Sequence, residues 1–136
     1  MPVRFSATFP GTPASVRAVR HAIAEIARRC GMSGEQVAQV RLAVSEAVSN
    51  AVIHAYAERE GDIFVDAHEG DGELVVKVAD EGGGVLPRPD SPGLGLGLPL
   101  IVALTSRMEI CHHGRRTEVV MAFDCPGARS RQGAVA

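Results

Sequence analysis

The sequence of 136 residues is short of lysine, tryptophan and cysteine, and it has no excess of positive charge. It has 14 basic and 16 acidic residues, and this net charge of −2 excludes the strongly basic surface of a general nucleic-acid-binding protein. Only Lys77 is a lysine, so phosphate chemistry here must rely on arginine, backbone amides or a metal. The three cysteines (Cys30, Cys111 and Cys125) are odd in number and widely spaced, which suggests neither a disulfide framework nor a metal pair.

Long hydrophobic runs are also absent. No window approaches the ~18 apolar residues that a membrane span needs, and residues 1–10 carry no apolar signal core. With its few, scattered cysteines, the chain is therefore expected in the reducing cytoplasm, without a membrane partner. Its length predicts one domain over residues 1–125, followed by a small, polar and disordered tail over residues 126–136.

The N-terminal half has the periodicity of one strand and two helices. Polar and apolar residues alternate at the start, and apolar residues then recur at three- and four-residue spacing. Thr12 and Pro13 predict the start of the first helix, and Ser33 with Gln36 forms a capping box for the second. The expected elements are a strand over residues 3–9 and helices over residues 13–30 and 34–57, with Val40, Val44, Val48 and Val52 in one line along the second helix.

The C-terminal half predicts two hairpins with a helix between them. Gly70 and Gly114 mark the two turns. The expected strands cover residues 63–68, 74–79, 108–112 and 117–123, and the expected helix covers residues 98–105. This order predicts an α/β (α+β) two-layer sandwich, in which a mixed, mostly antiparallel sheet has helices on one face.

A row of polar side chains lies on the second helix. Glu46, Asn50 and His54 are spaced by four residues, so they share one face, about half a turn from the valine line. Alone, this row is more typical of a solvated helix surface than of a site. Magnesium prefers oxygen ligands, so His54 is expected to pack or hydrogen-bond near a site rather than to bind a metal.

Two glycine-rich segments follow. Asp80 stands at the end of a predicted strand, directly before Glu81 and three glycines at 82–84. Without Cβ atoms, Gly82 and Gly84 would let a flat ring approach the backbone, while the carboxylate accepts a hydrogen bond from an exocyclic amine. Glycines at 93, 95 and 97 then open a helix, whose free amides suit an anion. Neither a dinucleotide fingerprint nor a Walker-type loop is present.

The three segments occur in a recognisable order. Glu-x-x-x-Asn on a helix, Asp-x-Gly-x-Gly after a strand and Gly-x-Gly-x-Gly into a helix resemble the GHKL superfamily of ATP-binding domains, which includes gyrase and sensor histidine kinases. The helix text over residues 45–56 and the strand text over residues 116–121 are most similar to the bacterial anti-sigma-factor serine/threonine kinases. The resemblance covers residues 5–123 and implies the Bergerat-type ATP-binding fold.

The resemblance assigns a role to each matching residue. Asn50 matches the asparagine that holds Mg²⁺ on the phosphates of ATP. Glu46 matches the candidate general base, which accepts the proton of an incoming serine hydroxyl. Asp80 matches the aspartate that reads adenine. The other ATP-binding matches are the adenine-pocket glycines Gly82 and Gly84, the phosphate-covering loop of Gly93, Gly95 and Gly97, and Thr117, which supports adenine through water.

The resemblance also implies partners. Members of the family phosphorylate a serine on a STAS-type anti-sigma-factor antagonist, sequester a sigma factor and commonly form homodimers. The segment that forms the ATP lid, residues 85–92, is short and contains three prolines. A non-catalytic, ATP-dependent switch is therefore an alternative. The catalytic module of a sensor histidine kinase is a weaker one, because the sequence has no room for a phospho-accepting helical hairpin before its first strand.

Overall fold

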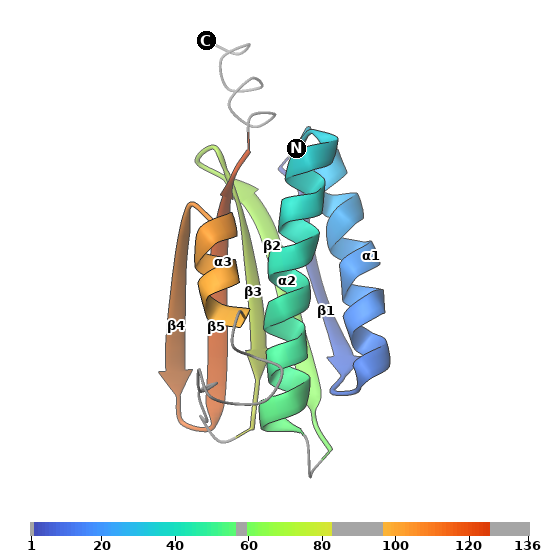
Figure 1. The fold of residues 1–136 in the computed structure, drawn as a ribbon, viewed down its shortest axis with the longest axis vertical. Coiled ribbons are helices and arrows are strands. Elements are labelled where there is room, and N and C mark those ends of the chain that lie inside the picture. Colours follow the sequence, from blue (N-terminus) through green and yellow to red (C-terminus); the bar gives the residue numbers. More distant parts are fainter. Residues whose placement is uncertain (1, 57–59, 83–96, 126–136) are drawn as a thin grey trace.

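The computed structural model describes residues 2–56, 60–82 and 97–125, and these residues form two layers (Figure 1). One layer is a five-stranded sheet in the order β1-β2-β3-β5-β4, and three helices cover one of its faces. This architecture confirms the predicted sandwich. The strands are β1 (Arg4–Pro10), β2 (Asp62–Gly70), β3 (Glu73–Asp80), β4 (Arg107–His113) and β5 (Arg116–Asp124), and the helices are α1 (Pro13–Arg29), α2 (Gly34–Ala55) and α3 (Gly97–Leu104).

The sheet is antiparallel at every strand pair, rather than mixed as predicted. The reason is the pair of helices between β1 and β2. Helix α1 returns the chain along the sheet, α2 runs back again, and β2 therefore starts beside the end of β1 (Figure 1). The remaining neighbours are hairpin partners or, for β3 and β5, strands separated by one helix and one strand.

Helix α2 begins as the sequence predicts. The Ser33 hydroxyl accepts a hydrogen bond from the Gln36 N–H at 3.2 Å, and the Gln36 side chain accepts one from the Ser33 N–H at 2.9 Å. The helix ends at Ala55, about one half-turn earlier than expected. Helix α1 begins at Pro13, but the Thr12 side chain makes no capping hydrogen bond.

The valine line of α2 faces the sheet. Val40, Val44 and Val48 are essentially inaccessible, and Val52 packs against the same cluster from its edge. Valine and alanine are small, so α2 packs closely against α1, α3 and β3. This central position holds the backbone of α2 against the sheet, and so sets where its polar row begins along the sheet.

Both predicted hairpins have two-residue turns. Asp71 and Gly72 each take a positive φ, of 54° and 75°, which matches the right-handed twist of β2 and β3. Gly114 takes a φ of 62° between β4 and β5. The turns fix the registers of β2 with β3 and of β4 with β5. The separate pairing of β3 with β5 places Asp80 opposite Thr117.

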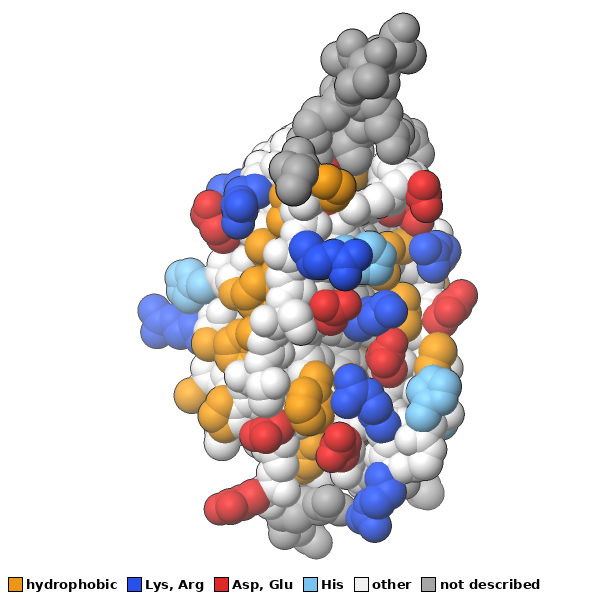
Figure 2. Space-filling view, turned by 180° about the vertical axis from the view of Figure 1, so that it is seen from behind, with side chains coloured by type: hydrophobic (Ala, Val, Ile, Leu, Met, Phe, Trp, Pro, Cys, Tyr) orange, Lys and Arg blue, Asp and Glu red, His pale blue; other side chains and the backbone are white. Residues whose placement is uncertain are grey.

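The second face of the sheet carries no helix and shows interleaved charges (Figure 2). Val75, Val120 and Ala122 form a small buried cluster there. The aliphatic parts of long charged side chains can cover such apolar surface. On this face the Lys77 Nζ atom lies 4.0 Å from a carboxylate oxygen of Glu118. Among the described helices, none has both the length and the apolar character needed to cross a membrane.

Candidate functional site

Asn50 is buried in the middle of the polar row. Its side chain is only 5% exposed, and its Oδ1 atom has no hydrogen-bond partner among the described residues. The solvated interpretation of the row is therefore wrong at this position. An unsatisfied buried polar atom costs about 1–3 kcal/mol, which a ligand at the site would offset. An amide oxygen is also a hard ligand of the kind that Mg²⁺ accepts, so the residue fits the role that the resemblance implies.

A small cavity brings the predicted residues together where α2 passes the ends of β3 and β5. Asn50 and His54 line it from α2, Asp80 lines it from β3 and Thr117 from β5. Three of these residues, Asn50, Asp80 and Thr117, are predicted ATP-binding residues, and the structure brings them together from separate parts of the sequence. The remaining lining is apolar and consists of Ala47, Ala51, Ala55, Val78, Leu98, Ile110 and Val119.

Asp80 ends β3 with its carboxylate held in one orientation. The Gly82 N–H donates a hydrogen bond to Oδ1 at 2.9 Å. Burial raises the pKa of Asp80 above its ordinary 3.8, and this effect exceeds the opposing effects of the Gly82 N–H and of the charges on His112 and Arg116. The second oxygen of a partly desolvated, oriented carboxylate is a strong acceptor for an amine on a ligand.

Gly82 is required by its contact with α2. A Cβ atom at this position would lie 2.3 Å from the Cβ of Ala55 and 2.6 Å from its Cα. The expected close approach at this glycine is therefore to the helix, which holds the exit of β3 against the end of α2. Its predicted contact with adenine stays a prediction.

His54 lies one turn beyond Asn50 and lines the same cavity. Its Nε2 atom is buried and has no hydrogen-bond partner among the described residues. Burial lowers the pKa of His54 below 6.5, so the neutral ring is favoured. This placement agrees with the expected packing role near a site.

The other predicted site residues divide into two groups. Glu46 lies one turn before Asn50 on α2, is partly exposed and is not among the residues that line the cavity. Gly97 begins α3. Gly84, Gly93 and Gly95 lie outside the described residues, as do the predicted lid (85–92) and the predicted tail (126–136).

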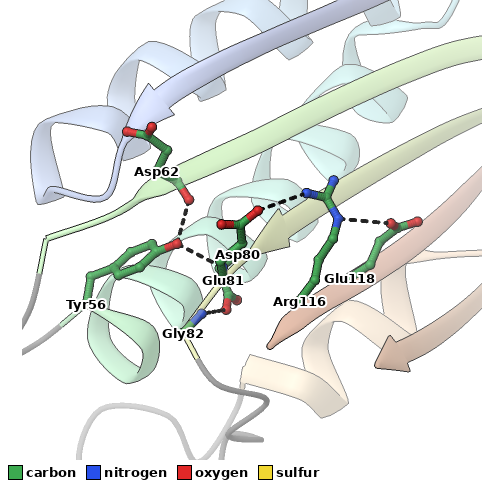
Figure 3. A network of polar contacts seen from close by, with 7 residues as sticks. All are labelled: Tyr56, Asp62, Asp80, Glu81, Gly82, Arg116 and Glu118. Atoms are coloured by element: carbon green, nitrogen blue, oxygen red, sulfur yellow. Dashed lines mark hydrogen bonds and ion pairs between the residues drawn. The ribbon is translucent and has the colours of Figure 1, made fainter. Parts of the chain in front are cut away.

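Tyr56 is a site-supporting residue that the sequence analysis missed. Its hydroxyl donates a hydrogen bond to the Asp62 carbonyl at 2.7 Å and accepts one from the Glu81 N–H at 2.9 Å (Figure 3). The ring lies where a Cβ atom on Gly11 or on Gly61 would collide with it, at 2.2 and 2.0 Å. Tyr56 therefore ties the end of α2 to the start of β2 and to the residue that follows Asp80. The only signal in the sequence was a single tyrosine at the end of a helix.

Replacing Tyr56 with phenylalanine is expected to lower both stability and nucleotide affinity. The Glu81 N–H would lose its acceptor, so the free energy of unfolding should fall by about 1–3 kcal/mol in urea titrations. Ser33→Ala is the matched control, because loss of that cap costs about 1 kcal/mol at the other end of α2. The control should keep its nucleotide affinity. Equal affinities in the two variants would contradict a supporting role for the tyrosine hydroxyl.

Arg116 contacts two acidic side chains beside the end of β3. Its guanidinium lies 3.8 Å from the Glu81 carboxylate and 3.9 Å from that of Glu118 (Figure 3). It also stacks over the Phe64 ring, 4.8 Å from the ring centroid. The antiparallel register places it beside the end of β3, which the sequence pattern could not reveal. The next residue, Thr117, has its hydroxyl 3.2 Å from Nδ1 of His112.

Arg107 lies far from this site. Its guanidinium pairs with Glu73 at 3.0 Å. Glu73 begins β3 and Asp80 ends it, so this ion pair stabilises the opposite end of the sheet. Arg107 is therefore not a phosphate ligand of the cavity beside Asn50.

Comparisons with known proteins agree with this geometry. The sequence of residues 9–123 matches the histidine kinase-like ATPase domain family. An anti-sigma F factor of Clostridium acetobutylicum is 30% identical over 75% of this chain and 80% of its own length. A serine-protein kinase RsbW of Listeria innocua is 39% identical over 54% of this chain, which spans about half (47%) of that relative's length.

A solved structure is similar over most of the chain. The RsbU and RsbW domains of a Mycobacterium tuberculosis protein match 90% of this chain and 32% of that chain, at 29% identity and a TM-score of 0.71. The histidine kinase domain of a blue-light-activated kinase from Erythrobacter litoralis has the same fold, with 21% identity, a TM-score of 0.57, and coverage of 86% of this chain and 62% of that one.

Proposed function

The chain belongs to the histidine kinase-like ATPase domain family, and from this premise we propose that it is an anti-sigma regulatory factor with protein serine/threonine kinase activity. It binds ATP, transfers the γ-phosphoryl group to a serine or threonine of an anti-sigma-factor antagonist, and sequesters a sigma factor. The relatives named anti-sigma F factor and serine-protein kinase RsbW support both parts of this proposal.

One observation carries the nucleotide-binding part of the proposal. The unpartnered amide oxygen of Asn50 and the oriented carboxylate of Asp80 line the same cavity. In the proposed complex Asp80 accepts a hydrogen bond from the adenine amine, Thr117 supports the same ring through water, and Asn50 holds Mg²⁺. When bound, Mg²⁺ neutralises charge on the phosphate oxygens. Gly82, Gly84, Gly93, Gly95 and Gly97 complete the proposed ATP site.

The transfer itself needs a proton acceptor. Glu46 projects from α2 one turn from Asn50 and stays partly exposed, so a partner's hydroxyl can reach it. We assign to Glu46 the role of general base, which takes the proton from the serine hydroxyl as its oxygen bonds to phosphorus. ADP leaves, and the phosphorylated antagonist no longer competes with the sigma factor for binding to this protein.

The partners follow from this assignment. The proposed partners are a sigma factor and a STAS-type antagonist, and the proposed assembly is a homodimer in the cytoplasm, where sigma factors act. The catalytic domain is taken to span residues 1–125. Neither direct nucleic-acid binding nor membrane attachment is part of the proposal.

Asn50→Ala tests the nucleotide and metal sites together. The affinity for Mg-ATP, measured by calorimetry, is expected to fall about tenfold or more, because a bond to a charged group contributes about 1.5–3 kcal/mol. Without divalent cation, the difference between variant and wild type should shrink. Gln39→Ala, an exposed change on the same helix, is the control. An unchanged affinity in Asn50→Ala would remove the metal role from this residue.

The kinase activity is tested with the antagonist encoded by the same organism. Incubation with Mg-ATP should add one phosphoryl group to a serine or threonine of the antagonist, which mass spectrometry detects. ATP binding without any phosphoryl transfer would instead indicate the non-catalytic switch. Absence of ATP binding would contradict the proposal as a whole.

A further inference from the structure

A second polar cluster lies at the end of the sheet away from Asp80. Cys30 caps the C-terminal end of α1, Glu69 lies near the end of β2, and Cys125 directly follows β5. The two cysteines are fully buried, and Glu69 is only 6% exposed. A glutamate this deeply buried is rare unless it has partners, so the cluster calls for a chemical explanation.

The atoms of the cluster are arranged as metal ligands would be. The two sulfur atoms and a carboxylate oxygen of Glu69 all lie within 4.8 Å of one another. The Cys125 Sγ atom is 3.4 Å from Oε2 of Glu69. Around zinc, Zn–S bonds of ~2.3 Å and Zn–O bonds of ~2.0–2.2 Å place neighbouring tetrahedral ligands ~3.5 Å apart. The separation between the Cys125 sulfur and the Glu69 oxygen therefore already matches the spacing of two zinc ligands, and the Cys30 sulfur lies within 4.8 Å of both.

The carboxylate of Glu69 is also oriented by a backbone hydrogen bond. The Val3 N–H donates a hydrogen bond to Oε1 at 3.0 Å, and Oε2 is the oxygen that faces Cys125. Metal-binding carboxylates are typically held in this way, by a hydrogen bond to the carboxylate from a group outside the ligand set. The Cys125 Sγ atom also lies 3.2 Å from the Cys30 carbonyl oxygen, so the N-terminal strand, α1 and the end of β5 converge on one point.

We propose that Cys30, Glu69 and Cys125 form a Zn²⁺-binding site. Two thiolates and one carboxylate are a suitable donor set for this ion, and a fourth ligand completes the tetrahedron. On binding, each thiol loses its proton to solvent and forms a Zn–S bond, so two protons are released for each ion. The bound metal ties the C-terminal end of α1 to β2 and to the exit of β5.

This site is separate from the nucleotide cavity. The strand register pairs Glu73 with Asp124 at one end of β3 and Asp80 with Thr117 at the other. The metal site lies beside the first pair and the nucleotide site beside the second. The inference therefore does not rest on the proposed kinase function. The sequence spacing hid the site, because 56 residues separate Glu69 from Cys125.

Metal titration of the reduced full chain tests the proposal, with Cys111 as an internal control because it lies outside the cluster. Wild type and Cys111→Ser should each bind about one Zn²⁺ per chain and unfold at a higher temperature when it is present. With Co²⁺ as the probe, both should show a thiolate-to-metal charge-transfer band. Cys30→Ser and Cys125→Ser should lose the band. Glu69→Gln keeps an acceptor for the Val3 N–H but should bind metal about 10- to 100-fold more weakly.

A second measurement does not depend on the folding of these variants. Calorimetric titration of wild type with Zn²⁺ in buffers of different ionisation enthalpy should show the release of about two protons per ion. Weak binding without proton release, or an equal charge-transfer band in Cys30→Ser and wild type, would overturn the proposal. So would a Cys30–Cys125 disulfide that forms readily in a chain that binds no zinc, since the pair would then be a redox couple.

Discussion

Replacing Glu46 with glutamine is expected to lower the rate of serine phosphorylation about 10²- to 10⁴-fold, with little change in ATP affinity. Glutamine keeps the size of the side chain but cannot accept the proton of the serine hydroxyl. Because Glu46 does not line the cavity formed by Asn50 and Asp80, its replacement leaves the nucleotide contacts in place. Single-turnover transfer from labelled ATP measures the rate, and calorimetry measures the affinity.

Glu35→Gln is the control for the Glu46 variant. Glu35 lies exposed in the first turn of the same helix, so this change also removes one negative charge from α2. Its phosphorylation rate should equal that of wild type. Equal rates in Glu46→Gln and Glu35→Gln would assign the proton transfer to another group. The proposed nucleotide site would be unaffected, but Glu46 would not be the general base.

The second large effect is expected at Asp80, where asparagine should weaken ATP binding about 10- to 100-fold. The Gly82 N–H holds Oδ1, so the amide NH₂ of asparagine would occupy the position of the second oxygen. That NH₂ would then face the adenine amine, and two donors cannot bond to each other. A lost hydrogen bond to a charged group accounts for a change of this size. Calorimetry with ATP and with GTP measures the effect, and the preference for adenine should fall as well.

The same substitution is expected to stabilise the nucleotide-free protein. Burial raises the pKa of Asp80 in the folded state above 3.8, its ordinary value. The carboxyl group therefore contributes stability that is fully present below pH 3.8 and lost as the pH rises through the folded-state pKa. Asparagine stays neutral, so at pH 7 the variant should unfold at a higher temperature than wild type. The difference should vanish in acid.

Asp66→Asn is the control for the loss of one negative charge. Asp66 lies in the middle of β2, away from the nucleotide cavity, and its replacement should leave the ATP affinity unchanged. A nucleotide-free Asp80→Asn protein less stable than wild type at pH 7 would show that the carboxylate is not a strained group. Such trade-offs between stability and binding are common at functional sites.

Local patterns predicted the elements well because each has a local cause. The capping box at Ser33 starts α2, Gly70 and Gly114 mark the hairpins, and the valine line names the buried face. The order of the three ATP-binding segments predicted that Asn50 and Asp80 belong to one site, and the resemblance to the kinase family added Thr117 to it. These residues do line one cavity, although their individual roles remain proposals.

The missed features depend on contacts between distant parts of the chain. Tyr56 contacts Gly11 and Gly61 only because α2 ends where β1 and β2 meet. Arg116 reaches Glu81 through the register of β3 and β5. Local patterns do not reveal contacts between segments that are distant in the sequence, so they predicted no role for either Tyr56 or Arg116.

The convergence of Val3 and Cys125 on Glu69 has a practical consequence for how the protein can be handled. The first and last parts of the described chain lie together at one end of the sheet (Figure 1), and Asp80 and Thr117 of the nucleotide cavity lie at the other end of β3 and β5. An immobilising tag attached at this end of the sheet, beside Glu69, would leave Asp80 and Thr117 at the end away from the support. Surface-based measurements of nucleotide and antagonist binding can therefore use this attachment.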